Sequence, residues 1–286
     1  MADHKSDGIL LVDKPSGITS HAVAERARQV LGTRRVGHAG TLDPFATGLL
    51  ILLVGRATRL VSYLDNEPKL YRATIRFGTR TATDDPEGEV IAEAALPSDS
   101  AIDNAIARLT GHLLQRPPIF SAKKVSGVRA YAAARRGEPL TLEPVAVTVH
   151  GWKTLKRSGA DLEVEIECSG GTYVRALARD LGEITESAAH LAVLRRERSG
   201  RYRATDGISM DTLMSGAFAL KPPRFAVEHL PQQGLDDLDA KRIKHGQSVQ
   251  ATVEGDLAAL LHGEEFVAVA VREEGAWRPK VVLADA

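Results

Sequence analysis

A single aspartate occupies a loop that glycine and proline shape on both sides. Asp43 lies in the stretch Gly37–Gly48, which reads G-H-A-G-T-L-D-P-F-A-T-G and runs directly into the aliphatic segment Leu49–Val54. The glycines permit backbone conformations that other residues resist and leave room for a second chain segment, while Pro44 steers Asp43 away from helical geometry. A carboxylate fixed in this way can act as a nucleophile or a base. For the tripeptide Leu-Asp-Pro alone, a turn that opens a hairpin is the stronger interpretation.

A tyrosine lies in an alternating stretch further along the chain. Lys69–Gly78 reads K-L-Y-R-A-T-I-R-F-G, and its period of two predicts a strand. One face of that strand carries Tyr71, Ala73, Ile75 and Phe77. On this pattern alone, Tyr71 is a core aromatic residue whose hydroxyl group reaches solvent.

An arginine begins a predicted helix after a pair of glycines. Thr172 is predicted to cap this helix, and Val174, Leu177 and Leu181 are predicted to face the core. Tyr173 and Arg175 then fall in its first turn. A cation at a helix N-terminus opposes the helix dipole, so Arg175 is expected to have a specific anionic partner.

Two other polar features are interpreted as solvated surface. The turn Thr83–Gly88 carries acidic residues on both sides of its proline, and is expected to face water. Arg179 is expected to form an ordinary surface ion pair with Asp180 or Glu183, which contributes little to stability.

Basic residues gather in two parts of the chain. Gln115–Arg136 contains six basic residues and no acidic one, with Phe120 and Tyr131 interleaved, and Arg195–Arg203 carries five basic residues and one acidic one. Basic residues with interleaved aromatic residues are typical of a protein that binds single-stranded or looped RNA. A solvated basic face is the alternative interpretation of such a run.

Composition restricts the class of protein. The chain has 286 residues, 43% of them hydrophobic, and its 37 basic and 37 acidic residues balance, so the local charge clusters matter more than the sum. The single cysteine, Cys168, suits a reducing cytosol and is expected to be a small buried residue. The nine histidines lack metal-ligand spacing, the N-terminus lacks a signal-peptide core, and the aliphatic run Leu49–Val54 is too short to cross a bilayer. A cytoplasmic protein without membrane or metal partner is expected.

The remaining patterns predict a mixed α+β domain, built on a mainly antiparallel sheet flanked by helices, and a smaller β-rich domain after it. Strands are predicted at Gly8–Val12 and, as an antiparallel pair, around Val145–Val149 and Asp161–Cys168. Helices are predicted from Thr19 or Ser20 to Gly32, over Arg56–Leu64, and from the cap Ser98 to about Leu109. Pro222-Pro223 marks a break, and the expected domains are 1–228, with a basic insert at about 115–140, and 229–286.

The loop around Asp43 resembles the catalytic motif of the TruB family of tRNA pseudouridine synthases, G-H-x-G-x-L-D-P-x-A-x-G. The segment Leu11–Ser20 resembles that family's K-P-x-G motif, Lys69-x-Tyr71 its tyrosine motif, and Cys168–Arg175 its C-S-x-G-T-Y-I-R motif. The resemblance implies that Asp43 is the catalytic aspartate, that Arg175 pairs with it, and that Tyr71 stacks on the target base. It further implies that Leu194 packs against this base, that Tyr173 helps to exclude water, and that His38 contacts the RNA.

The same resemblance suggests how the RNA is held. The stretch Gln115–Gly137 is similar to the family's mobile thumb, which closes on the T-arm of tRNA. Lys123, Lys124 and Arg129 there, and Arg195 and Arg196 in the second cluster, are the expected RNA-binding residues. The tail from about His229 resembles the PUA-type RNA-binding domain.

Together, these resemblances imply an enzyme that isomerises uridine to pseudouridine at position 55 in the T-loop of tRNA. The target base must be flipped out of its stack, and Asp43 attacks either the ribose C1′ or the uracil C6. Neither a metal nor an organic cofactor is needed, and a monomer is expected. A catalytically silent RNA-folding chaperone is the alternative, although it would not need Asp43, Tyr71 and Arg175 together. An aspartate-nucleophile hydrolase would need a second acid or base to activate water, and none stands out.

Overall fold

The structure is a computed structural model that describes residues 7–120, 124–125, 128–129, 140 and 142–283. Lys123 therefore lies outside the described residues. Of Lys124 and Arg129 only the backbone is described, in the paired strands β8 (Lys124–Val125) and β9 (Val128–Arg129).

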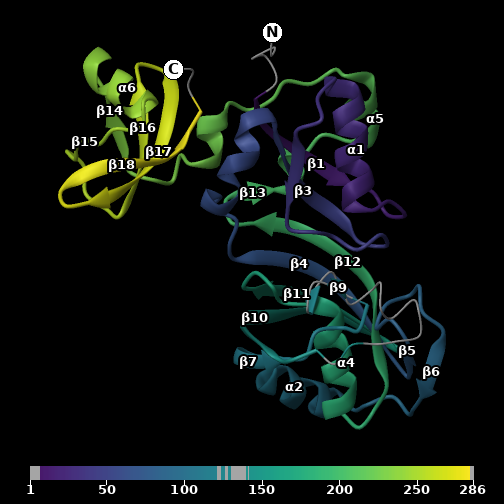
Figure 1. The fold of residues 1–286 in the computed structure, drawn as a ribbon. Helices are drawn as coiled ribbons and strands as arrows, with labels where there is room; N and C mark the ends of the chain where they lie inside the picture. Colours follow the sequence, from purple (N-terminus) through teal and green to yellow (C-terminus); the bar gives the residue numbers. More distant parts are fainter. Residues whose placement is uncertain (1–6, 121–123, 126–127, 130–139, 141, 284–286) are drawn as a thin grey trace.

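A nine-stranded sheet forms the main body of the molecule (Figure 1). Its strands run in the order β1, β3, β12, β4, β11, β10 and β7, with β2 paired to β3 and β13 paired to β12. Every pairing is antiparallel except that of β12 with β3, which is parallel. The strands are β1 (Gly8–Lys14), β2 (Val36–Ala39), β3 (Thr47–Val54), β4 (Lys69–Phe77), β7 (Gly111–Gln115), β10 (Val145–Ser158), β11 (Asp161–Cys168), β12 (Ala189–Ser199) and β13 (Tyr202–Arg203). A mainly antiparallel sheet was predicted, and it is confirmed.

Helices pack against this sheet and contribute to three hydrophobic cores. They are α1 (Ser20–Leu31), α2 (Asp99–Arg108), α4 (Val174–Ile184) and α5 (Met210–Ser215), with the 3₁₀ helices η2 (Gly55–Tyr63), η3 (Ala204–Asp206) and η4 (Pro223–Ala226). Leu177 and Leu181 of α4 pack with Ile75, Val164 and Leu191 of the central strands. The buried strand face Tyr71, Ala73, Ile75 and Phe77 contributes to the same core, as its period of two predicted.

Two of the three predicted helix caps are confirmed and one is wrong. The side chains of Thr19 and Ser98 accept hydrogen bonds from the N–H groups of Ala22 and Ala101. Thr172, however, does not cap α4, because Tyr173 takes the N-cap position and the hydroxyl group of Thr172 lies 3.4 Å from that of Ser169. Gln115, at the end of β7, accepts from the Tyr173 N–H at 2.8 Å and donates to its carbonyl at 3.1 Å. The helix start is therefore tied to a distant strand.

A second, five-stranded sheet ends the chain and packs beside the first (Figure 1). Its order is β14 (Gln232–Gly234), β16 (Leu257–His262), β17 (Glu265–Glu273), β18 (Ala276–Val282) and β15 (Val249–Gln250), and α6 (Asp237–Lys244) packs against it. One core joins the two sheets, since Leu60 and Tyr202 of the main body share it with Phe266, Val269 and Val281. This β-rich half-barrel fits the PUA-like architecture that was expected. None of the helices in the described part of the chain is long and apolar enough to cross a membrane.

The parallel contact between β3 and β12 depends on a glycine. Gly48 lies opposite Arg196 in the register, and its φ is 100°. A Cβ atom at Gly48 would lie 2.3 Å from the carbonyl oxygen of Arg196, a separation that real Cβ atoms essentially never show. The glycine thus provides the close approach of a second chain segment that the sequence suggested.

Substituting Gly48 with alanine should therefore destabilise the fold beyond the backbone penalty alone. Gly111 is the matched control, because its φ is 96° and nothing lies within 4 Å of an added Cβ. Both Gly48→Ala and Gly111→Ala should lose roughly 1–3 kcal/mol from the unfavourable φ, and Gly48→Ala should lose a further ~2 kcal/mol from the clash. Urea unfolding measures both variants. Equal losses would mean that β12 does not pack against this glycine.

Candidate active site

Buried polar side chains hold the backbone of the loop that carries Asp43. Lys14, at the end of β1, is fully buried and donates to the carbonyl oxygens of Pro15, Ile18 and Pro44 at 3.0, 2.7 and 3.1 Å. Burial lowers the pKa of this lysine to about 8, while the charge of Asp43 acts to raise it. Ser20, on α1, accepts from the Leu42 N–H at 2.8 Å. Lys14 thus braces the backbone on both sides of the Asp43 loop.

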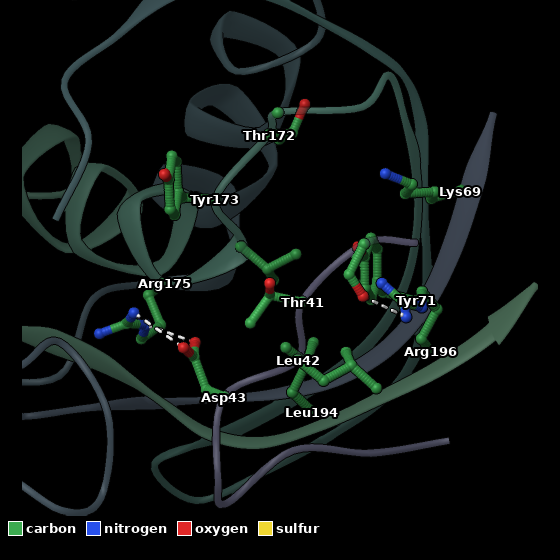
Figure 2. A pocket seen from close by; sticks show the side chains of 13 residues that line it. Thr41, Leu42, Asp43, Lys69, Tyr71, Thr172, Tyr173, Arg175, Leu194 and Arg196 are labelled. Carbon is green, nitrogen blue, oxygen red and sulfur yellow. Dashed lines mark hydrogen bonds and ion pairs between the residues drawn. The ribbon is translucent and has the colours of Figure 1, made fainter. Parts of the chain in front are cut away.

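Asp43 opens into a cavity of about 240 Å³ at one end of the central strands. Its lining comes from the Asp43 loop, from β4, from the start of α4 and from β12: Gly40, Thr41, Leu42, Asp43, Lys69, Tyr71, Gly171, Thr172, Tyr173, Val174, Arg175, Leu194 and Arg196. Figure 2 shows Asp43 with Arg175 at one wall and Tyr71 with Arg196 at the other, with Leu42 and Leu194 between them. The predicted catalytic residue and four predicted substrate-binding residues meet here, namely Asp43, Tyr71, Tyr173, Arg175 and Leu194, together with Arg196, which was predicted to bind RNA.

The predicted pair of Asp43 and Arg175 is present. Nη2 of Arg175 donates to Oδ1 of Asp43 at 3.2 Å, and its Nε lies 2.9 Å from Oδ2. The second contact is electrostatic, since its angle falls outside hydrogen-bond geometry. The arginine side chain is 5% exposed and that of the aspartate 34%. The aspartate therefore keeps one open side toward the cavity while the arginine is withdrawn from water.

Competing effects set the ionisation of Asp43. Removal from water raises the pKa of its carboxyl group, and the nearby charge of Asp85 raises it further. Arg175 acts in the opposite direction through its charge and its hydrogen bond, and Lys14 adds a smaller contribution of the same sign. The net pKa lies above that of an ordinary aspartate. A reaction that uses the carboxylate should fail as the pH falls through this raised pKa.

Arg175 has a second acidic partner that the sequence interpretation missed. Its Nη1 donates to Oδ2 of Asp85 at 3.1 Å and to the carbonyl of Thr83 at 2.9 Å, and its Nη2 also donates to the carbonyl of Phe120 at 2.9 Å. The turn Thr83–Gly88 was expected to be solvated, and this is wrong. Asp84 and Asp85 are 6% and 4% exposed. The turn joins β5 (Thr79–Thr81) to β6 (Val90–Glu93) and reaches the arginines of α4.

Arg179 is likewise buried, contrary to the surface ion pair that was expected. One helical turn after Arg175, it contacts Oδ2 of Asp84 at 3.4 Å and Oδ1 of Asp180 at 2.7 Å. It also donates to the carbonyl of Arg116 at 2.9 Å. Burial raises the pKa of Asp84, and the charges of Arg179 and Arg80 oppose that rise. Arg175 and Arg179, at positions i and i+4 of α4, thus hold both the acidic turn and the backbone at Arg116 and Phe120.

The second wall of the cavity pairs a tyrosine with an arginine. Tyr71 is buried on β4, and its hydroxyl group is hydrogen-bonded to Arg196 (Figure 2). Burial raises the pKa of Tyr71, and the charge and hydrogen bond of Arg196 oppose this rise. Leu194, on β12, is buried nearby, with Ala73 as its partner in the register.

Two residues that were expected to bind RNA have partners within the protein. Arg196 is 1% exposed, and it donates to the carbonyl oxygens of Leu49 and Gly40, so it is no surface cation. Arg195 forms a two-pronged ion pair with Asp13, at 2.9 Å for each contact, and contacts Glu197 as well. Carbonyl oxygens therefore surround Arg196, and carboxylates neighbour the charge of Arg195.

The remaining candidates are placed as follows. His38 lies half-buried on β2, outside the cavity lining that the described residues define. Burial lowers its pKa, and the charge of His21 lowers it further. Cys168 is buried on β11, and burial raises the pKa of its thiol to about 11, which confirms its interpretation as an inert core residue. Among the described residues, no group of three or more His, Cys, Asp or Glu side chains is arranged to hold a metal ion.

Lys69 is a cavity residue that was not predicted. It lies two positions before Tyr71 on β4, and Figure 2 shows its ammonium group across the cavity from Asp43. Burial is the largest of the effects that lower its pKa. The period of two along this strand is the signal that could have found it, because residues at i and i+2 share a face.

Comparison with known proteins gives consistent matches. The family model described as "TruB family pseudouridylate synthase (N terminal domain)" matches residues 28–174. The tRNA pseudouridine synthase B of Arthrobacter sp. (strain FB24) is 41% identical over 295 residues, covering 97% of this chain and 96% of that protein. The same enzyme of Thermobifida fusca (strain YX) is 42% identical, covering 98% and 99%. Among solved structures, a Cbf5-Nop10-Gar1 complex matches with a TM-score of 0.72 and 25% identity, over 97% of this chain and 85% of that one.

The buried acidic turn leads to a stability prediction. Removing Arg179 leaves Asp84 buried beside one fewer cation, so Arg179→Met should lose about 3 kcal/mol or more. Arg76 is the matched control, since it pairs with Asp161 at 2.7 Å but its side chain is 51% exposed. Arg76→Met should lose less than ~1 kcal/mol. Urea unfolding at neutral pH compares the two.

The sign of the pH dependence provides a further check. The pKa of Asp84 is raised in the folded state, so its charge destabilises the fold at a pH above that pKa, and protonation relieves this. The defect of Arg179→Met should therefore shrink as the pH falls, and adding Asp84→Asn should restore part of the loss at neutral pH. A defect that is independent of pH and unaffected by Asp84→Asn would contradict the pairing.

Proposed function

The chain belongs to the TruB family of pseudouridylate synthases, and we propose that it isomerises uridine to pseudouridine at position 55 in the T-loop of tRNA. The names of its relatives support tRNA as the substrate and pseudouridine as the product. The observation that carries the proposal is the Asp43–Arg175 pair, which faces a cavity of single-nucleotide size opposite Tyr71.

The geometry supports an ionised nucleophile. Asp43 has one side open to the cavity, and Arg175 holds its carboxylate through one hydrogen bond and one electrostatic contact. The planar guanidinium both offsets the loss of water around the carboxylate and orients its oxygens. The flipped uridine enters between Tyr71 and Leu194, whose apolar surfaces exclude the water that would hydrolyse the intermediate.

The last chemical step needs a base for the proton on C5. Once the uracil is rejoined through C5, the C5–H bond breaks and its electron pair forms the C5=C6 double bond. The pair displaced from C6 moves to N1, which takes up a proton, or leaves with the Asp43 carboxylate where that group is bonded to C6. Tyr71 lines the cavity beside this position, and its phenolate oxygen, which has released its own proton to solvent, takes the proton from C5 and becomes a neutral phenol.

Recognition of the T-arm rests on parts of the chain on either side of the site. The insert at about 115–140 serves as a thumb, and Lys123, Lys124 and Arg129 contact RNA phosphates. Arg175 and Arg179 hold the carbonyl groups of Phe120 and Arg116, which ties the start of this insert to the catalytic wall. The β-rich domain at 229–286 adds a second RNA contact beside the catalytic domain at 1–228, and the protein acts as a monomer.

The site favours an enzyme over a silent RNA chaperone. Holding Asp43, Asp85 and Arg175 together away from water costs stability unless each charge keeps its partner. A chaperone needs basic surface for RNA but gains nothing from a buried, arginine-paired carboxylate that points into a cavity. The presence of this arrangement therefore supports catalysis.

Incubation with an unmodified tRNA transcript tests the proposal. Mapping at nucleotide resolution should find pseudouridine at position 55 with the wild-type protein and none with Asp43→Asn, which keeps shape and volume but removes the charge. Asp211→Asn, an exposed aspartate on α5, is the matched control and should keep wild-type turnover. Binding of tRNA by Asp43→Asn should persist.

Three other outcomes would each contradict one part of the proposed function. If Asp43→Asn retained even a few per cent of wild-type turnover, Asp43 would not be the nucleophile. A product at another position would refute the T-loop assignment. Tight binding by the wild type without any product would support the chaperone.

A further inference from the structure

Arg196 occupies a position that its sequence context does not reveal. It lies on β12, directly opposite Tyr71 of β4 in the register, and it is 1% exposed. Its Nε donates to the carbonyl of Leu49 at 2.8 Å, and its Nη2 donates to the carbonyls of Gly40 and Leu49 at 2.8 and 2.6 Å. The guanidinium group is thus fixed between the Asp43 loop and β3.

The same guanidinium group is hydrogen-bonded to the hydroxyl group of Tyr71 (Figure 2). An arginine has donors only, so the phenol oxygen must be the acceptor. Glycine at position 40 makes this possible, because an added Cβ would lie 3.0 Å from Nη1 of Arg196. The fold therefore places a fixed cationic donor on the oxygen that faces the substrate cavity.

We propose that Arg196 is a positioning residue for Tyr71: it fixes the phenol oxygen beside the target uracil and stabilises the phenolate that then takes the proton from C5. This inference rests on the proposed function. It assigns separate arginines to the two reactive oxygen groups of the cavity: Arg175 of α4 to Asp43, and Arg196 of β12 to Tyr71.

The surrounding charges fit this assignment. The groups that act on the Tyr71 hydroxyl are Arg196 from β12, Cys168 from β11 and Asp43 from the loop, and Lys69 shares the cavity from the strand of Tyr71 itself. Burial, Cys168 and Asp43 all raise the pKa of Tyr71, whereas Arg196 lowers it through its charge and its hydrogen bond. Without Arg196 the phenol would hold its proton more tightly, and less of the base form would exist at neutral pH.

A purely structural role is the alternative, because Arg196 also connects Gly40 and Leu49. Such a role would lower turnover equally with and without the Tyr71 hydroxyl. The dependence on that hydroxyl, and recovery by a cationic donor at position 196, therefore separate the two roles.

The experiment measures kcat at saturating tRNA from about pH 6 to about pH 9 for the wild type, Arg196→Gln, Tyr71→Phe and the double variant. Arg196→Gln should lower kcat at neutral pH by roughly 10- to 100-fold, within the range that a positioned base contributes. Because the pKa of Tyr71 lies above that of an ordinary tyrosine, the phenolate is a small fraction over this whole pH range, and the defect should keep about the same factor across it. Activity is lost at low pH because Asp43 becomes protonated, and this loss should occur at the same pH in Arg196→Gln as in the wild type. When Tyr71→Phe is already present, adding Arg196→Gln should lower kcat by less than about threefold.

Two further variants make the result decisive. Arg196→Lys keeps a cationic donor and should recover part of the turnover with the pH profile of the wild type, and it serves as the test variant if Arg196→Gln does not fold. Arg198→Gln changes the next but one residue of β12, an arginine whose partner is Glu167, and should leave the pH profile unchanged. Equal losses with and without the Tyr71 hydroxyl, or no recovery of turnover in Arg196→Lys, would overturn the inference. An inactive wild type would instead refute the proposed function itself.

Discussion

A carboxylate that is withdrawn from water but must stay charged is the constraint on which this site depends. Asp43 would bind a proton readily in its cavity, and the guanidinium group of Arg175 opposes this through charge and a hydrogen bond. Arg175 is itself buried, so it needs acceptors for its remaining donors. Asp85 and the carbonyls of Thr83 and Phe120 supply them. One ionised group in the cavity thus requires a chain of buried partners behind it.

That requirement explains why distant parts of the chain meet at the end of the central strands. The loop between β2 and β3 carries Asp43, α4 carries Arg175, and the turn between β5 and β6 carries Asp85. The opposite wall follows the same logic, because Arg196 of β12 contacts Tyr71 of β4 and two backbone carbonyls. Gly40 and Gly48 allow both the guanidinium and the backbone of Arg196 to approach the loop. The glycines around Asp43 therefore shape the loop and admit its neighbour.

Local elements were readable from the sequence because their signals are local. Thr19, Gly32 and Ser98 mark helix ends through contacts within four residues, and the period of two along Lys69–Phe77 identifies its buried face. The pairing of Arg175 with Asp43 also followed, from a cation placed where the helix dipole is unfavourable and from the family motif. Long-range partners were not readable in this way.

The acidic turn shows why. Asp84 and Asp85 look like solvated turn residues until α4, some 90 positions later, brings Arg175 and Arg179 against them. Arg196 was taken for an RNA contact because it lies in a basic cluster, and only the parallel pairing of β12 with β3 buries it. Thr172 does not cap α4, because the backbone of the N-cap residue Tyr173 is held by Gln115 of another strand. In each case the environment of a polar side chain was set by a segment far away in the sequence.

The pKa of Asp43 itself tests this account most directly. Carbon-13 NMR of protein labelled at its aspartate carboxyl groups can follow the titration, with Asp43→Asn identifying the signal. The account predicts that Asp43 titrates above the range of an ordinary aspartate in the wild type, because burial outweighs the attraction of Arg175. In Arg175→Met the pKa should rise further, since the main opposing charge is gone. The same pKa in both proteins would contradict the claim that Arg175 keeps the buried carboxylate ionised.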